Sequence, residues 1–276
     1  MKLIWLGHGS FRIETGNLVL LVDPWLTGNP VLPEAQHEAA VAGATHLILT
    51  HAHFDHVADM LPLARKLSCP IVGQYDLMSY WNEHEHLNTV GFNKGGTVEL
   101  GDGVNLTMVP ASHSSTFGTD QGPKAAGSEV GYILRAEGRS LYISGDTDIM
   151  ADMDWMGDYY KPDVGILSAG GHFTMDMAGA AYAAKRYFNF KTVIPCHYKT
   201  FPILAQSANV LAAALPDVNV IEPDIMVPID LYGATAARQQ TPVAAPRTLP
   251  PKRRHNTRAQ HGLAEHQTPQ TPEPPP

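Results

Sequence analysis

The chain has little cysteine, no long apolar run and no obvious targeting segment. Two cysteines among 276 residues are too few for a disulfide framework. No apolar run approaches the ~18 residues that a membrane-spanning helix needs. The apolar stretch 1–6 is too short for a signal peptide, and Gly7-His8 interrupts it. These absences predict a cytoplasmic protein with no membrane partner.

Basic residues are scarce in most of the chain and gather near its end. Residues 236–276 hold nine of the 22 prolines and six Lys or Arg against two Glu. That segment carries +4, so the rest of the chain carries −12 of the total of −8. We predict a hydrolase domain over residues 1–235 and a disordered, Pro-rich, basic tail over 236–276. A body at −12 lacks the basic surface on which nucleic-acid binding depends, so we expect no nucleic-acid partner.

The most informative segment of the chain is His51-Ala52-His53-Phe54-Asp55-His56. Residues i and i+2 of an extended segment point the same way, so His51 and His53 can reach one cation together. Asp55 and His56 follow where the pattern turns helical, and they aim elsewhere. The alternative is a capped loop with surface histidines, which gains nothing from three histidines at this spacing. One metal ion would leave donors unused, so the segment is interpreted as half of a two-metal site.

Three further residues supply candidates for the other half of that site. His113, Asp146 and His197 each lie at or just beyond the C-terminal end of an apolar run, as His51 does. Such segment ends are where functional side chains gather on a rigid scaffold. The donors are nitrogen and oxygen, which fits zinc, manganese or iron, and we expect two divalent ions, zinc first among these.

Residues 1–230 resemble the metallo-β-lactamase superfamily. Within it, the nearest resemblance is to uncharacterised metal-dependent hydrolases akin to ascorbate-6-phosphate lactonase. Gly9 departs from that group, which more often has Ser after the first histidine. The segments that carry the resemblance beside the histidine motif are Gly7–Phe11, Val22–Pro30, Ser112–Ser115, Phe173–Met175, and His197–Tyr198 before Thr200–Pro202.

The resemblance implies a role for each candidate ligand. His51, His53 and His113 would hold one metal ion. Asp55, His56 and His197 would hold the second, and Asp146 would bridge both.

The hydrophobic pattern predicts two halves, each mixing strands with helices on one side. We expect two mixed sheets packed face to face with helices outside, and the resemblance names this α+β arrangement the four-layer αβ/βα sandwich. Gly16-Asn17 is expected to form a hairpin turn. The expected strands are 3–6, 11–14, 18–22, 46–50, 71–72, 98–100, 104–109, 130–136, 140–144, 164–167 and 192–195, and the expected helices are 57–67 and 177–188.

Four residues near the candidate ligands have a functional and a structural interpretation. Asp23 could orient a ligand imidazole by hydrogen bonding, or form a turn before Pro24. His8 and His172 each follow glycine in an expected loop, where either could line the pocket or serve only the loop. Cys196 is expected to be a small buried hydrophobic residue, because strand alternation turns it away from the face of His197.

The ligand set predicts hydrolysis by metal-activated water. Two cations sharing a hydroxide lower the pKa of water from about 15.7 to near 7. We assign catalytic roles to Asp55 and to Asp146, which would fix the metal spacing and later accept a proton. The predicted function is metal-dependent hydrolysis of a small, soluble ester, lactone or sugar-phosphate, with an anionic substrate favoured.

Three alternatives remain beside this prediction. A nucleic-acid phosphodiesterase conflicts with the charge of −12 and with the lack of a basic, glycine-rich insertion. Di-iron proteins that reduce oxygen or nitric oxide carry a carboxylate where this chain has His53, and use a flavin domain. A non-catalytic metal-binding protein is the third alternative. The sequence leaves a homo-oligomer open.

Overall fold

The computed structural model describes residues 1–119 and 122–232, which lie within one compact unit. The predicted tail, 236–276, lies outside the described residues. None of the helices in the described ranges has the length and apolarity needed to cross a membrane.

The first of two seven-stranded sheets contains most of the N-terminal half. Its strands run in the order β16-β1-β2-β3-β4-β5-β6. Strands β16 to β3 pair antiparallel, and β3 to β6 pair parallel. The predicted two-residue turn at Gly16-Asn17 joins β2 to β3, where Thr15 pairs with Leu18. The strand bounds are β1 (Lys2–Gly7), β2 (Ser10–Thr15), β3 (Leu18–Val22), β4 (His46–Ile48), β5 (Ile71–Gln74), β6 (Thr89–Phe92) and β16 (Pro228–Asp230).

The second sheet repeats this mixed pattern in the order β15-β14-β13-β12-β11-β8-β7. Strands β7, β8, β11 and β12 pair antiparallel, and β12 to β15 pair parallel. A separate hairpin, β9 (Thr116–Thr119) with β10 (Gly122–Ala125), follows β8. The strand bounds are β7 (Thr97–Gly101), β8 (Val104–Pro110), β11 (Val130–Ala136), β12 (Arg139–Ile143), β13 (Val164–Ser168), β14 (Thr192–Cys196) and β15 (Asn219–Val220).

Side-chain alternation along β1 shows why the first sheet lies between two apolar layers. Leu3 and Trp5 join the core cluster shared with the second sheet. Ile4 and Leu6 point the other way, into a second cluster with the helices of the N-terminal half. Successive strand residues face opposite sides of a sheet, so a strand that is apolar on both faces must be covered on both.

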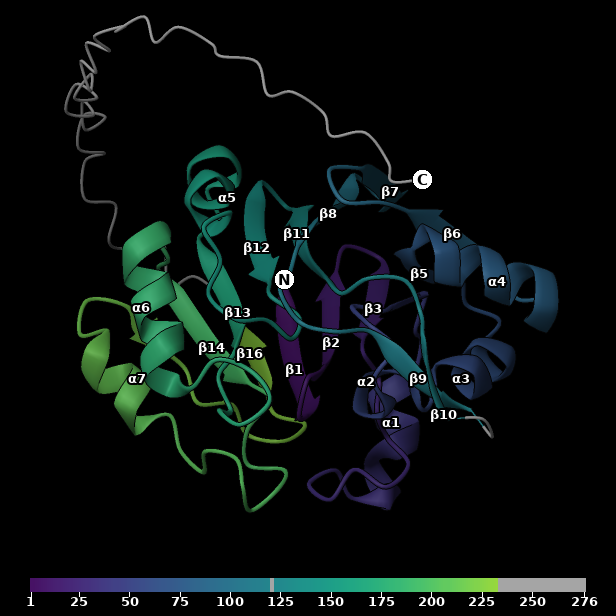
Figure 1. The fold of residues 1–276 in the computed structure, drawn as a ribbon, viewed down its shortest axis with the longest axis horizontal. Helices are drawn as coiled ribbons and strands as arrows, with labels where there is room; N and C mark the ends of the chain where they lie inside the picture. Colours follow the sequence, from purple (N-terminus) through teal and green to yellow (C-terminus); the bar gives the residue numbers. More distant parts are fainter. Residues whose placement is uncertain (120–121, 233–276) are drawn as a thin grey trace, which may run out of the picture. The chain divides into compact units, whose positions relative to one another are not determined.

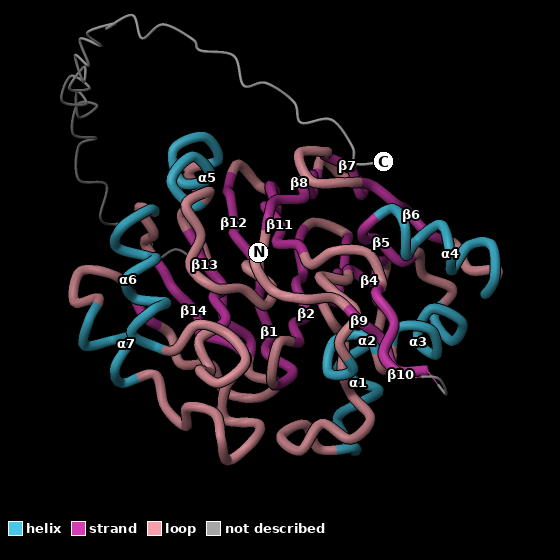
Figure 2. Tube along the Cα trace, viewed as in Figure 1, coloured by secondary structure: helices cyan, strands magenta, loops and turns pink. Residues whose placement is uncertain are grey.

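The helices cover the outer faces of both sheets (Figures 1 and 2). Residues of α1, α3 and α4 pack on the first sheet, and residues of α5, α6 and α7 pack on the second. The predicted four-layer sandwich is therefore confirmed. The helix bounds are the 3₁₀ turn Glu34–Gln36, α1 (His37–Val41), α2 (Phe54–Val57), α3 (Met60–Leu67), α4 (Tyr75–Glu85), α5 (Met153–Tyr160), α6 (Met177–Tyr187) and α7 (Asn209–Ala214).

The predicted helix over 57–67 is wrong as a continuous element, because it is two helices, α2 and α3. Pro62 lacks an N–H, and its ring would clash with the carbonyl of Ala58 in a continuous helix, whereas proline in a first turn is tolerated. The Asp59 carboxylate at the break accepts hydrogen bonds from Leu26 N and Thr27 N at 2.7 and 2.9 Å. The break therefore ties the loop after β3 to the histidine motif.

The predicted strand 46–50 is also too long, since β4 ends at Ile48. Leu49 N still bonds to Val72 O at 3.0 Å. Thr50 N instead donates to Asp23 Oδ1 at 2.7 Å. The Asp23 side chain thus takes the place of strand β5 as the hydrogen-bond acceptor where the chain leaves β4 and enters the site.

Candidate metal centre

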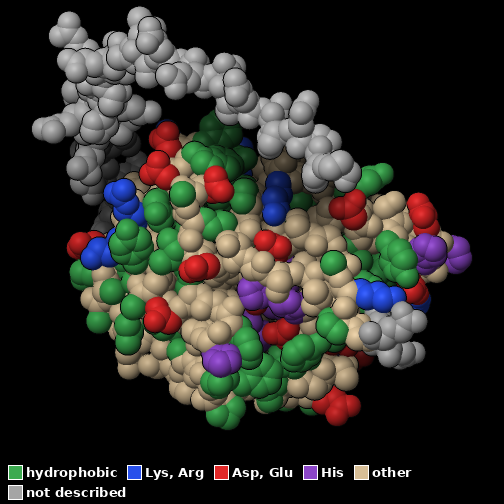
Figure 3. All heavy atoms as spheres, in the orientation of Figure 1, with side chains coloured by type: hydrophobic (Ala, Val, Ile, Leu, Met, Phe, Trp, Pro, Cys, Tyr) green, Lys and Arg blue, Asp and Glu red, His purple; other side chains and the backbone are tan. Residues whose placement is uncertain are grey.

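The predicted ligands follow strands that end at one edge of the sandwich. His51 follows β4, His113 follows β8, Asp146 follows β12 and His197 follows β14. Histidine side chains gather near the middle of the face shown in Figure 3. The fold therefore brings together segments that are up to 146 positions apart in the chain (51 to 197).

His51, His53 and His113 form one group of converging nitrogens, here called the histidine triad. His51 Nε2 lies 3.0 Å from His53 Nδ1, which lies 3.3 Å from His113 Nε2. Zinc bonds of 2.0–2.1 Å in a tetrahedron would place neighbouring donors about 3.3 Å apart. The triad therefore fits a cation as three of its ligands.

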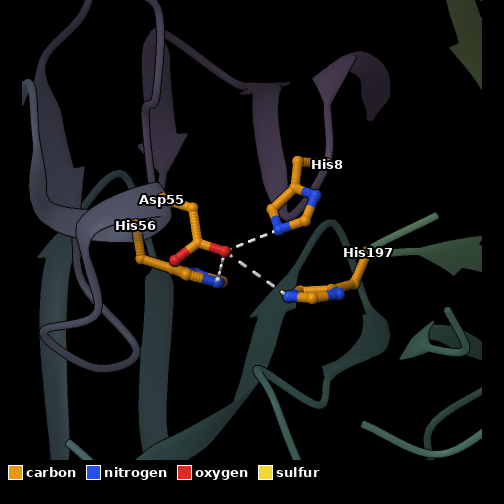
Figure 4. A group of neighbouring side chains, drawn as sticks. All are labelled: His8, Asp55, His56 and His197. Atoms are coloured by element: carbon orange, nitrogen blue, oxygen red, sulfur yellow. Dashed lines mark hydrogen bonds and ion pairs between the residues drawn. The ribbon is translucent and has the colours of Figure 1, made fainter. Parts of the chain in front are cut away.

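His8, Asp55, His56 and His197 form a second group, here called the carboxylate cluster (Figure 4). Asp55 Oδ2 lies 2.7 Å from His8 Nε2, 3.6 Å from His197 Nε2 and 3.8 Å from His56 Nε2. All four residues are buried. His56 Nε2 is buried and has no hydrogen-bond partner among the described residues, as expected for a ligand atom that faces a cation.

Asp146 lies between the two groups. Its Oδ2 is 3.0 and 3.4 Å from Nε2 of His197 and His56 in the carboxylate cluster. The same oxygen is 3.7 and 3.8 Å from Nε2 of His113 and His51 in the histidine triad. One buried carboxylate oxygen within 4 Å of both groups is the geometry that a bridging ligand needs.

The imidazoles of the triad are held neutral. Burial lowers the pKa of His51 well below its usual value, and the His56 charge lowers it further. Burial likewise lowers the pKa values of His53 and His113. A metal ligand must have a free lone pair, so a neutral imidazole binds without first releasing a proton.

Two imidazoles of the carboxylate cluster, those of His56 and His197, have the opposite tendency. Burial works to lower the pKa of His197, but Asp146 and hydrogen bonds to Asp146 and Asp55 raise it to about 9. The pKa of His56 is raised well above its usual value, since Asp146, Asp23 and Asp55 outweigh burial. Burial works to raise the pKa of Asp55, but His56, His197 and His8 lower it. Protons on His56 and His197 balance the carboxylates here, and a cation would replace them.

Asp23 orients the imidazole of His56. Its Oδ2 lies 2.8 Å from His56 Nδ1, so His56 Nε2 is the nitrogen left facing the site. Thr50 donates to the same carboxylate from its backbone N at 2.7 Å and from Oγ1 at 2.5 Å. A carboxylate behind a ligand histidine fixes its ring orientation and raises its basicity.

His8 is drawn into the site more closely than expected. His8 is fully buried. Its backbone also contacts the cluster, because His197 N donates to His8 O at 3.0 Å. Its Nδ1 lies 2.7 Å from Thr200 Oγ1, a partner to which sequence reasoning gave no role. Burial lowers the pKa of His8 to about 4. A neutral His8 can donate from Nε2 to Asp55, and its Nδ1 lies beside Thr200 Oγ1, which also donates to Tyr198 O at 3.0 Å.

His172 and Cys196 lie outside both groups. His172 is exposed, and its ring contacts Phe173 with the centroids 4.5 Å apart. Cys196 is buried in the core as a free thiol, and burial raises its pKa well above the usual value.

Several residues at the site have positive φ angles, and two glycines there have no room for a side chain. His8, Asp23 and His197 have φ of +55°, +43° and +59°, a region that non-glycine residues rarely adopt. A Cβ on Gly170 would lie 1.8 Å from His197 O, and one on Gly9 would lie 2.7 Å from His56 Cε1. The departure at Gly9 therefore leaves room for the His56 ring.

Comparison with known proteins assigns the chain to a family. A family model described as the Beta-lactamase superfamily domain matches residues 19–198. A "UPF0173 metal-dependent hydrolase" of Ruegeria pomeroyi is 73% identical over 231 residues, which are 84% of this chain and 100% of that protein. A protein of the same description from Paracoccus denitrificans is 61% identical, with the same coverage.

A solved structure agrees with the sequence matches. The metallo hydrolase Igni18 of Ignicoccus hospitalis superposes with a TM-score of 0.70 at 30% identity, covering 84% of this chain and 99% of that one. Its similarity extends to the whole described sandwich. The chain therefore belongs to the β-lactamase superfamily, has the metallo-β-lactamase fold, and is a metal-dependent hydrolase.

Proposed function

We propose that the histidine triad and the carboxylate cluster each hold one divalent cation, zinc first among the candidates, and that water activated between them hydrolyses a small ester or lactone. The observation that carries this proposal is the position of Asp146, whose Oδ2 lies within 4 Å of histidines from both groups. Bound cations of this kind lower the pKa of water to near 7 and polarise a carbonyl oxygen.

Three aspartates of the protein have separate roles in this proposal. Asp146 would supply an oxygen to both positions. Burial works to raise its pKa, but His197 and His56 hold the pKa well below the usual value, so its carboxylate is ionised. Asp55 is ionised as well, and the hydrogen bond at 2.7 Å from His8 fixes its carboxylate. Asp23 holds His56 with Nε2 facing inward. The reaction adds water to the carbonyl carbon and breaks the C–O bond, giving an acid and an alcohol.

Elemental analysis of metal-replete protein tests the number of ions. We expect close to two ions per chain, because the two groups and Asp146 offer more donors than one tetrahedral site can use. His113→Ala should retain about one ion. His84→Ala, a change on exposed α4, is the matched control and should retain two. One ion or fewer in the unmodified protein would contradict the dinuclear centre.

A substrate panel then tests the reaction class. Lactones, carboxylic esters, thioesters and phosphodiesters, including oligonucleotides, should be assayed with metal-replete protein. We expect turnover of lactones or esters. Activity confined to oligonucleotides would support the phosphodiesterase alternative, and a metal-loaded protein inactive on every class would support a binding role.

A further inference from the structure

Four aromatic side chains border the metal centre, and they come from four separate segments. Phe54 and Phe173 are 63% and 50% exposed, Phe201 is partly buried, and Trp25 is buried at 4% exposure. We call Trp25, Phe54, Phe173 and Phe201 the aromatic rim. In the sequence, each of these rings comes one to four positions after an aspartate or a histidine, namely Asp23, His53, His172 and His197.

The rim is continuous with the carboxylate cluster. The Phe54 ring lies 5.7 Å from Trp25, which lies 6.0 Å from Phe201, measured between ring centroids. Trp25 and Phe201 lie 5.4 and 5.6 Å from the His8 ring. On another side, Phe173 lies 6.3 Å from the His197 ring. A molecule bound between Asp55 and His197 is therefore within reach of apolar rings.

Packing does not explain an exposed phenylalanine at position 54. Its neighbours His53 and Asp55 both turn into the site, and this leaves the Phe54 side chain on the outside at the start of α2. A polar residue would meet the same backbone requirement. Single exposed apolar side chains are ordinary, but several that border one functional site form a surface suited to an apolar ligand.

The carboxylates of the site pair with histidines. Among the described residues, no Lys or Arg forms an ion pair with Asp55 or Asp146. Lys199, near His197 in the chain, pairs with Glu222 instead and lies 5.2 Å from the Tyr198 ring. In Figure 3, acidic and hydrophobic side chains lie beside the central histidines, and the Lys and Arg side chains visible on this face lie farther away. A phosphate remote from the reacting bond would lack the Arg or Lys partner that such groups use.

We propose that the aromatic rim binds an uncharged, apolar group of the substrate, so that the preferred substrate is an aliphatic or aromatic carboxylic ester or lactone. This inference rests on the proposed function, and it narrows the predicted range away from sugar-phosphates and other anionic substrates. Burying apolar substrate surface against the rim supplies the affinity, while the metal centre supplies the reaction.

Alkyl hydroxamates, which ligate metals through their head group, test the inference by binding as well as by catalysis. Dissociation constants of aceto-, butyro-, hexano- and octanohydroxamate are measured by calorimetry on metal-replete protein. We expect affinity to rise roughly fourfold per methylene, the effect of burying a CH₂ group. Adipic monohydroxamate has the six carbons of hexanohydroxamate but ends in a carboxylate, and we expect it to bind more weakly.

Two variants link this dependence to the rim. Phe54→Ala and Phe201→Ala should each weaken hexanohydroxamate roughly tenfold and leave acetohydroxamate unchanged. Tyr159→Ala on α5, where an aromatic ring is 73% exposed away from the site, is the matched control and should change neither ligand. Metal content is checked in each variant, and kcat/KM for esters of increasing chain length should follow the same pattern.

The outcomes separate the inference from the proposed function. Equal affinity along the series, tighter binding of adipic monohydroxamate, or no effect of the rim variants would overturn the inference while leaving the metal centre in place. If acetohydroxamate itself does not bind, the metal centre as proposed is wrong and the inference falls with it.

Discussion

The two halves of the metal centre differ in how they are assembled and charged. The histidine triad takes two of its members from one short segment, and their low pKa values leave neutral donors. The carboxylate cluster joins three distant segments through hydrogen bonds, and the raised pKa values of its His56 and His197 favour the protonated forms of these two residues. A cation at the first position would meet neutral donors, whereas a cation at the second would displace protons from His56 and His197. The short segment 51–56 therefore contributes to two groups that differ in charge: it supplies neutral histidines to the triad, and Asp55 and His56 to the carboxylate cluster.

Asp146→Asn should have the largest effect, because Asp146 is the residue that both halves share. An amide offers one neutral acceptor where the carboxylate offers charged oxygens near both groups. We expect at least ~100-fold loss of kcat, the scale of removing a preorganised electrostatic group, with reduced metal content at both positions.

Cys196→Ala is the control for that change, since Cys196 is buried beside His197 without belonging to either group. It should cost only packing, roughly 1 kcal/mol of stability. An active Asp146→Asn enzyme would contradict the bridging assignment. Loss of metal from Cys196→Ala would mean that sulfur belongs to the site.

Gly170→Ala should impair the second position selectively. A Cβ there would lie 1.8 Å from His197 O, so the backbone that carries His197 must shift. We expect metal analysis to give about one ion per chain, retained by the triad. Gly118→Ala is the control, because its Cβ would meet nothing within 4 Å. Two ions retained in Gly170→Ala would show that the contact relaxes without moving His197.

His8→Ala should weaken the second position without removing it. His8 holds Asp55 and is itself held by Thr200, and loss of such a supporting partner costs about 10–100-fold in metal affinity. Stepwise metal titration should show this loss for one ion only. Weakening of both ions equally would mean that His8 supports the whole edge of the sandwich and not one position.

The smallest expected effect is a pH dependence of metal-free stability. His197 has a pKa of about 9 in the fold against an ordinary 6.5, so its charge stabilises the fold below pH 6.5. That contribution is lost as pH rises through 9. The triad histidines are neutral throughout this range and contribute no slope. We expect stability to fall by on the order of 2 kcal/mol between pH 6.5 and 9, a drop of about 4–8 °C in Tm.

Thermal unfolding in the presence of a chelator measures this effect. The slope should become smaller in His197→Ala, where His56 with its raised pKa supplies the remainder, and it should persist in His113→Ala. A metal-free protein whose Tm is flat over this range would contradict the difference in charge between the two halves.

Several elements escaped prediction because their pattern is weak or their partner is distant. The hairpin β9–β10 lies in a segment rich in Gly, Ser and Thr, which gives little apolar alternation. Strand β16 is three residues long and exists because it pairs with β1 more than 220 positions away, Lys2 opposite Asp230. Helix α5 mixes acidic and aromatic residues, and only tertiary packing buries Met153 and Met156.

The sequence by itself determined the sandwich and the set of candidate ligands. Strands that are apolar on both faces require cover on both, and His51, His53, Asp55 and His56 at this spacing favour metal binding over any structural role. Tertiary structure alone decided that Asp23 holds His56, that His8 holds Asp55, and that Trp25 and Phe201 stand beside them. These contacts join residues far apart in the chain, and their hydrogen bonds depend on where each strand ends, which no local pattern specifies.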